Sequence, residues 1–163
     1  MGLTTPPRPL TEYSRRGIAA GSPVEKFIEG ASQTYKAGAP IILASGKVIE
    51  ATSPVNATNK AVGLAVAKAT GVTNAEALAV ALDPAYMLFE GTLSNATAGT
   101  HTLAQTDIGL IYPILKDSGT GNWYLDTNAT AAEGGFVVAA REPIGTVDAR
   151  VIFRVTRGLI LGS

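Results

Sequence analysis

Short apolar segments separated by turn residues repeat along most of this chain. Segments of this length, bounded by Gly, Asn, Asp or Pro, predict β-strands. Their spacing favours an all-β fold, a small β-barrel or β-sandwich with at most one short helix, over alternating β/α units. The segments are residues 41–50, 62–66, 86–90, 110–115, 123–125 and 136–140.

Two turn signals refine this pattern. Ser45-Gly46 lies between two apolar stretches of residues 41–50, and glycine accepts positive φ, so a tight hairpin is predicted there. Pro113 has no amide hydrogen to donate to a ladder, so its strand is expected at a sheet edge or with a bulge.

Residues 73–82 allow two interpretations. Thr73 or Asn74 could cap a short helix of good helix formers that Asp83-Pro84 would end. The same residues could form a strand of small side chains, which we favour from Leu78 onward.

The last strand has the clearest alternation of apolar and polar positions. One face is expected in the core and the other, a basic face, towards water or a partner. The predicted core face holds Val151, Phe153 and Val155, and the opposite face Arg150, Ile152, Arg154 and Thr156. Further strand positions expected to hold the domain together are Ile42, Val66, Leu88 and Phe89.

Composition supplies material for a core and little for catalysis. Of the 163 residues 46% are hydrophobic, with no cysteine, one histidine and a net charge of zero. Nucleophilic and acid/base catalysis draw mostly on Cys, His and clustered carboxylates, so we expect no enzyme and no cofactor. Zero net charge argues against bulk attraction to nucleic acid or anionic membrane, and no apolar run approaches a membrane helix. We expect a soluble protein made in the cytoplasm.

The first 25 residues differ from the rest of the chain. They hold four of the nine prolines, which fix φ and remove backbone donors, so we interpret residues 1–25 as an extended arm and 26–163 as a single β domain. The arm is expected to be mobile unless a partner orders it, and its deletion to leave a folded domain. Its candidate partner-binding residues are Arg8, Leu10, Tyr13, Arg15 and Arg16.

Candidate chemical motifs are weak. His101 has no Gly-x-Ser-x-Gly turn beside it and is interpreted as a surface loop residue. Neither a calcium loop, a His pair nor a phosphate-binding glycine loop occurs, so no metal site is expected. Asp83 and Glu90 could meet as a glycosidase pair, although solvated turns are the simpler interpretation.

Asn-Ala-Thr triplets and one tryptophan invite alternatives. The triplets that begin at Asn56, Asn95 and Asn128 are interpreted as turns in which Asn and Thr cap their own backbone. Trp123 could be a platform for a sugar or a base, but a lone Trp in a small β domain is more often a core residue.

Several segments together resemble small virion structural proteins of tailed bacteriophages, in particular capsid decoration (cement) proteins. An Asp-Pro turn leads into a Phe-Glu strand within residues 81–91, and residues 149–155 form an Ala-Arg-Val-type basic strand. The chain departs from the pattern in the Ala-rich residues 61–85 and at the apolar tail 159–161. The remaining matching segments are residues 62–66, 108–113, 123–126 and 136–138.

The resemblance implies a β-fold protein, often trimeric, that sits on the outer capsid surface and bridges subunits of the major capsid protein. The arm would grip an acidic or strand-edge surface of that partner, and a subunit interface would use Arg150, Arg154 and Arg157. No catalytic residue, nucleic acid or membrane is implied. A tail or head-completion protein, a glycan-binding β module and an enzyme using His101 stay open as alternatives.

Overall fold

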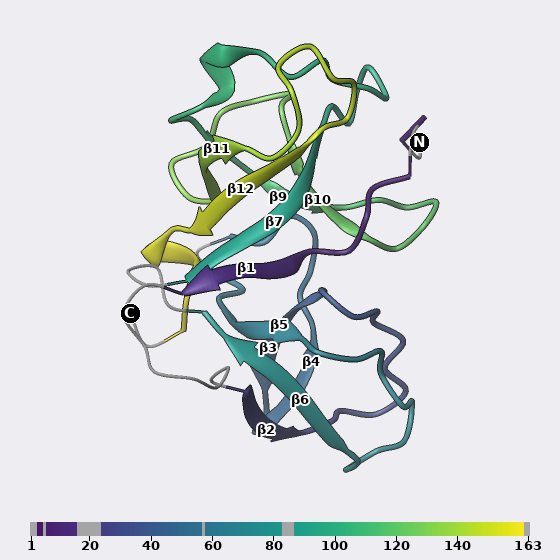
Figure 1. Ribbon diagram of the computed structural model, residues 1–163. Coiled ribbons are helices and arrows are strands. Elements are labelled where there is room, and N and C mark those ends of the chain that lie inside the picture. Colours follow the sequence, from purple (N-terminus) through teal and green to yellow (C-terminus); the bar gives the residue numbers. More distant parts are fainter. Residues whose placement is uncertain (1–2, 5, 16–23, 57, 83–86, 162–163) are drawn as a thin grey trace.

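The computed structural model describes residues 3–4, 6–15, 24–56, 58–82 and 87–161 (Figure 1). Strands dominate, and the helices among these residues are two 3-10 turns, η1 (Gln105–Asp107) and η2 (Arg157–Leu159). None of the described helices is long and apolar enough to cross a bilayer. The predicted all-β fold is confirmed.

The first sheet curls into a nearly closed barrel. Its order is β8-β11-β12-β7-β10-β9, and β1 also pairs with β7. β8 and β9 are consecutive in the sequence but form the two opposite ends of this series, where β8 pairs with β11 and β9 pairs with β10. Pro113 separates the two strands. The proline therefore stands where the ladder is interrupted, as its missing amide hydrogen predicts. The strands are β1 (Thr11–Arg15), β7 (Met87–Ser94), β8 (Ile111–Tyr112), β9 (Ile114–Lys116), β10 (Trp123–Asp126), β11 (Gly135–Ala140) and β12 (Arg150–Val155).

The second sheet has the order β2-β6-β5-β3-β4. A parallel bridge between Glu29 and Val48 brings the end of β2 to β4, so this sheet also curls. It lies below the first sheet in Figure 1, and β1 crosses the molecule between them. The strands are β2 (Val24–Ile28), β3 (Pro40–Ala44), β4 (Lys47–Glu50), β5 (Ala61–Ala65) and β6 (Glu76–Ala81).

Two sequence predictions are settled in the second sheet. β3 and β4 form the expected hairpin, in which Ser45 and Gly46 both have positive φ, 51° and 77°. Two successive residues of positive φ are typical of the type I′ turn, whose twist matches that of the paired strands. The strand interpretation is correct for the second half of residues 73–82, and β6 begins at Glu76, two residues before Leu78.

Both sheets contribute to one connected cluster of buried side chains. Phe89 of β7 and Phe153 of β12 pack with ring centroids 5.9 Å apart, and Ile41 and Val48 supply the second sheet's part. The predicted core face of β12 is confirmed, since Val151, Phe153 and Val155 are at most 3% exposed.

Two predicted burial positions are wrong. Ile152 was assigned to the solvent face of the last strand but is only 8% exposed, because β12 lies between β7 and β11 and has neighbours on both sides. Val66 was assigned to the core but is 44% exposed, because β5 ends at Ala65 and the chain leaves the sheet there.

Candidate functional site

Residues 3–15, described except for residue 5, run across the surface of the body, and we call them the N-terminal strap. The Leu3 amide donates to Asp117 Oδ1 at 2.9 Å, and Asn122 Nδ2 donates to the Pro7 carbonyl at 2.6 Å. Further along, β1 pairs antiparallel with β7. Backbone groups therefore hold the strap even where its prolines have no amide to donate.

Leu10 anchors the strap in the core. Its side chain is 2% exposed and lies against Gly91, where an added Cβ would come within 2.7 Å of Leu10 Cδ2. The Leu10 backbone crosses Gly38, where an added Cβ would be 2.3 Å from the Leu10 carbonyl oxygen. Gly38 has φ +81°. Glycine at position 38 is thus required for two reasons: it adopts the positive φ, and it lacks a Cβ that would collide with the Leu10 backbone.

This position corrects the sequence interpretation of Leu10 as a partner-binding residue, because its side chain is already buried within its own chain. Deletion of the arm without unfolding stays a prediction, and the packing of residues 3–15 argues against it. Deletion would remove a core side chain and a sheet strand. The sequence did not reveal the packing of Leu10, because closely spaced prolines indicate which backbone hydrogen bonds are missing but not which side chains are buried.

The other predicted arm residues lie in different places. Arg8 is exposed, and its Nη1 lies 3.5 Å from Glu142 Oε1. Tyr13 and Arg15 belong to β1, whose pairing with β7 has a register shift between Glu12 and Ser14. Arg16 lies outside the described residues.

The predicted subunit-interface arginines differ in their surroundings. Arg150 Nε lies 2.9 Å from Glu90 Oε1, and the Arg150 amide donates to Glu142 Oε2, so Arg150 uses acids of its own chain. Arg154 is exposed and stacks over Phe136, with its guanidinium carbon 4.6 Å from the ring centroid. Arg157 is exposed at the start of η2.

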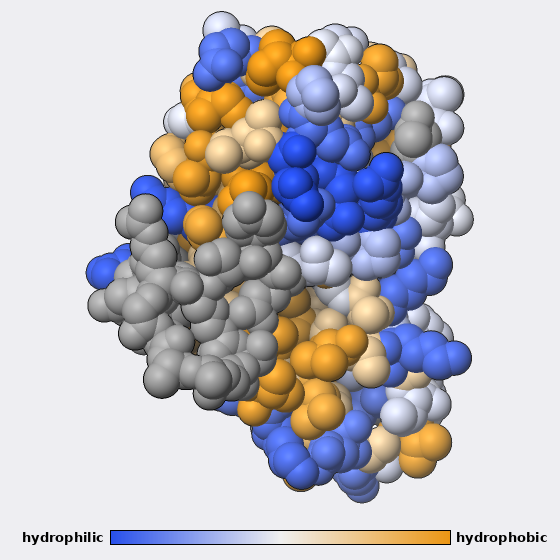
Figure 2. Space-filling model, viewed as in Figure 1, coloured by the Kyte–Doolittle hydropathy of each residue, from blue (hydrophilic) through white to orange (hydrophobic). Residues whose placement is uncertain are grey.

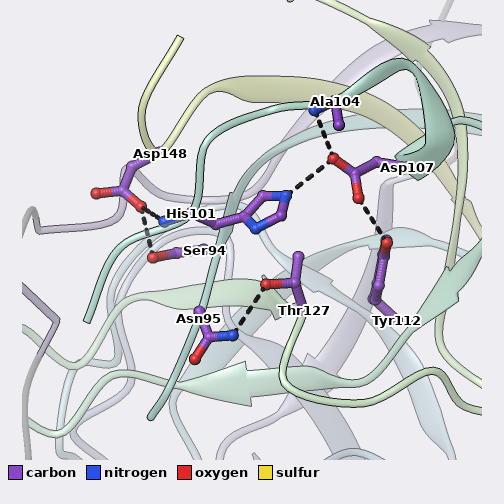
Figure 3. A network of polar contacts seen from close by, with 8 residues as sticks. All are labelled: Ser94, Asn95, His101, Ala104, Asp107, Tyr112, Thr127 and Asp148. Carbon is purple, nitrogen blue, oxygen red and sulfur yellow. Dashed lines mark hydrogen bonds and ion pairs between the residues drawn. The ribbon is translucent and has the colours of Figure 1, made fainter. Parts of the chain in front are cut away.

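The main buried polar network surrounds Asp107 (Figure 3). Asp107 Oδ2 lies 2.8 Å from His101 Nε2 and accepts the Ala104 amide at 2.8 Å. Asp107 Oδ1 accepts the Tyr112 hydroxyl at 2.8 Å. The loop before η1 brings His101 and Asp107 together, so His101 is a loop residue as predicted, but it has a buried carboxylate partner that the sequence did not indicate.

Hydrogen bonding outweighs burial in setting the pKa of Asp107. Burial alone would raise this pKa, but the hydrogen bonds from His101, Ala104 and Tyr112 together hold it below its usual value of 3.8. The same contact acts in the opposite direction on Tyr112, since burial and then the Asp107 carboxylate raise the pKa of the phenol.

We predict that Asp107 contributes to acid unfolding. Its folded-state pKa is depressed, so its stabilisation is present above the unfolded-state pKa and is lost as pH falls through the folded-state value. Asp107→Asn should cost about 1–3 kcal/mol at pH 7, and the difference from wild type should shrink as pH falls to about 3. Urea unfolding across this range measures it, with exposed Glu25→Gln as control. A difference independent of pH would contradict the prediction.

The network has part of the geometry of a hydrolase site. A carboxylate orients an imidazole, and a nucleophile would have to bond the other ring nitrogen. No described hydroxyl makes that hydrogen bond: Ser94 Oγ donates to Asp148 Oδ1 at 2.7 Å, and Thr127 Oγ1 accepts from Asn95 Nδ2 at 3.4 Å. The Asp148 oxygen also accepts the His101 amide at 2.9 Å, so these contacts fix the loop.

Buried carboxylates elsewhere also serve the backbone. Glu29, 1% exposed, accepts the Thr70 and Gly71 amides at 2.9 and 2.7 Å and lies within 3.4 Å of the Tyr35 hydroxyl. Burial, followed by the charge of Glu29, raises the pKa of Tyr35 to about 12. Asp117 and Asp126 similarly accept amides of nearby loops. Sequence analysis missed these acids because their partners are distant or are main-chain groups.

The remaining motifs have structural positions. Trp123 is 1% exposed and donates its indole hydrogen to Glu50 Oε1 at 3.1 Å, so it is a core residue and offers no stacking platform. Asn56 and Asn95 cap their own turns, since Asn56 Oδ1 accepts the Thr58 amide and Asn95 Oδ1 the Thr97 amide, both at 2.9 Å. The turn interpretation is confirmed for these two triplets.

The glycosidase pair of Asp83 and Glu90 stays a prediction, because Asp83 lies outside the described residues. Glu90 Oε1 lies 2.9 Å from Arg150 Nε. The described part of the chain contains no group of three or more His, Asp or Glu residues that could hold a metal ion. Comparison of the chain with protein-family models, with curated proteins and with solved structures gave no match.

Proposed function

We propose that this chain is a structural protein of a tailed-phage virion, which decorates the outer capsid surface and stabilises the shell by bridging major capsid protein subunits. One observation supports the proposal: each buried acid among the described residues accepts hydrogen bonds from groups of its own chain and so helps to hold the loops to the β body. The buried acids are Glu29, Asp107, Asp117, Asp126 and Asp148. Function then depends on the outer surface, as adhesion to a shell requires.

The charged groups of that surface favour contact with a protein partner. Figure 2 shows a hydrophilic area over the region where β12, β7 and β1 lie side by side. Arg8, Arg141 and Arg150 meet Glu90 and Glu142 there. The side chains of Arg8 and Arg141 are exposed, at 62% and 54%. These two arginines suit an acidic patch on the partner, which would mainly speed and orient binding.

The arrangement on the shell follows from the same proposal. Copies of the chain associate as trimers on the capsid, with Arg154 and Arg157 facing acids of a neighbouring copy. Arg15, the last residue of the strap, and Arg16, which follows it in the sequence, contact the major capsid protein, while the strap itself stays on the body. Binding is spread over many weak contacts, so no single surface substitution abolishes it.

Heads of the encoding phage, prepared without this protein, provide the test. We expect the purified chain to co-sediment with these heads saturably and to raise the temperature at which they release DNA, with isolated tails as control. Arg8→Glu should weaken binding about 5-fold, the upper value for one exposed ion pair, and Lys47→Glu on the β3–β4 hairpin should not. Binding to tails, or none to heads, would contradict the proposal.

A further inference from the structure

An apolar cleft lies between β1 and the second sheet. Its volume is about 210 Å³, and in Figure 2 apolar surface gathers over β5 and β6, below the position of β1. Pockets for drug-sized ligands usually measure about 300–1,000 Å³, so this cleft fits one or two side chains rather than a whole small molecule. Its lining includes Pro9, Leu10, Thr11, Ala37, Val66 and Val80.

The cleft is bordered by a strand edge. β1 pairs with β7, and no other described strand pairs with it. β1 supplies Thr11 to the cleft wall, and the strap residues Pro9 and Leu10 precede it. A strand with one unpaired edge can receive an added strand through main-chain hydrogen bonds, while a neighbouring pocket selects the side chain.

Two lysines lie next to the cleft lining in the sequence. Lys36 precedes the lining residue Ala37, and Lys68 follows the lining residue Val66 by two positions. Backbone hydrogen bonds hold these two loops together, from the Ala69 amide to the Tyr35 carbonyl at 2.9 Å and from the Gly38 amide to the Ala65 carbonyl at 2.8 Å.

Both lysines are exposed, and neither forms an ion pair with another residue in the described part of the chain. The described residues close in sequence to the apolar wall therefore include two exposed lysines. Charge complementarity favours an occupant that combines an aliphatic group with negative charge.

We propose that this cleft binds an extended peptide segment of a partner protein. The segment adds a strand to β1, places an aliphatic side chain against Val66 and Val80, and carries an acidic residue that pairs with Lys36 or Lys68. The strand edge distinguishes a peptide from a free fatty acid, which would use the apolar wall and the lysines but not the main chain of β1. The inference does not depend on the capsid role, because it concerns the chemistry of the cleft.

A fluorescein-labelled heptapeptide tests the inference. The probe has a central leucine between two valines and a glutamate at each end. We expect saturable binding to the full chain by fluorescence anisotropy, weakened by salt. A probe with lysines in place of glutamates, and one with N-methylated backbone amides, should each bind at least about 5-fold more weakly. Equal binding of either control probe would overturn the proposed acidic peptide strand.

Matched variants place the binding at the cleft. Val66→Lys should abolish binding, whereas Val147→Lys should not, because Val66 lines the cleft and Val147 does not, and both are about half exposed, at 44% and 53%. Lys36→Glu with Lys68→Glu should weaken binding about 25-fold, and Lys47→Glu with Lys60→Glu should leave it unchanged. Circular dichroism checks that each variant is folded. If Val66→Lys does not fold, the comparison of the two lysine double variants decides whether the peptide binds at the cleft. Equal effects within a pair, or no saturable binding at 1 mM peptide, would overturn the inference.

Discussion

Gly38→Ala is expected to lower the free energy of unfolding by about 3–5 kcal/mol, whereas Gly46→Ala should lower it by only about 1–2 kcal/mol. Both glycines have nearly the same positive φ, +81° and +77°, so both substitutions strain the backbone similarly. They differ in their surroundings. A Cβ at Gly38 would lie 2.3 Å from the Leu10 carbonyl oxygen and 2.8 Å from the Leu10 nitrogen, whereas a Cβ at Gly46 has nothing within 4 Å.

The difference between the two variants isolates the contact with the strap. Backbone atoms cannot rotate away as the end of a flexible side chain can, so the strap must shift or the 34–39 loop must distort. Urea unfolding of both variants measures the cost, and hydrogen exchange should show loss of protection in β1 for Gly38→Ala alone. Equal destabilisation by the two substitutions would show that the strap does not lie against Gly38.

Leu10→Ala should lower the free energy of unfolding by about 2–5 kcal/mol, because it removes a side chain that is 2% exposed and leaves a cavity beside Gly91. Leu43→Ala is the matched control. Leu43 is 42% exposed, so its truncation removes less buried surface and should cost under about 1 kcal/mol. Chemical denaturation measures both. If the Leu10→Ala protein is as stable as the Leu43→Ala control, Leu10 does not anchor the strap and the strap is only loosely attached to the body.

The losses of stability caused by Gly38→Ala and Leu10→Ala should not be additive. Gly38→Ala displaces the backbone of Leu10, so much of the side-chain packing that Leu10→Ala removes is already lost in the double variant. A double-mutant cycle should therefore show a combined cost smaller than the sum of the single costs. Such coupling would identify the strap as one structural unit.

The free energy of unfolding of a protein is typically about 5–15 kcal/mol, so the losses expected for Gly38→Ala and Leu10→Ala are a large share of it. The strap is therefore part of the folded body, and variants that test partner binding must leave Leu10 and Gly38 unchanged. Arg8 is suitable, because its side chain is 62% exposed and makes one ion pair. Lys36 and Lys68 are also suitable, because both are exposed.

Local signals in the sequence predicted many elements correctly. Ser45-Gly46 placed the hairpin because positive φ at two successive residues is a property of the turn itself. The alternation of Val151, Phe153 and Val155 placed the core face of β12 because side chains point to opposite faces of any strand. Pro113 marked the break in the ladder because it has no amide hydrogen.

The specific partners of buried polar side chains were not predictable in this way. Asp107 joins His101 and Tyr112 through the fold of one loop onto β8, and no spacing of residue types specifies that meeting. Glu29 binds the amides of Thr70 and Gly71, which any sequence at those positions would supply. A main-chain partner leaves no trace in the amino-acid sequence.

The sequence by itself determined that this protein is all-β and where its Ser45-Gly46 hairpin lies, and its composition is the basis for our proposal of a surface function. These properties follow from backbone dihedral preferences, side-chain alternation and composition, each of which acts within a few residues. Only the tertiary structure decided that the N-terminal strap belongs to the body, that Arg150 is paired within its own chain, and that an apolar cleft lies beside β1. Each of these depends on which segments meet across the two sheets, and that is set by the packing of the whole core.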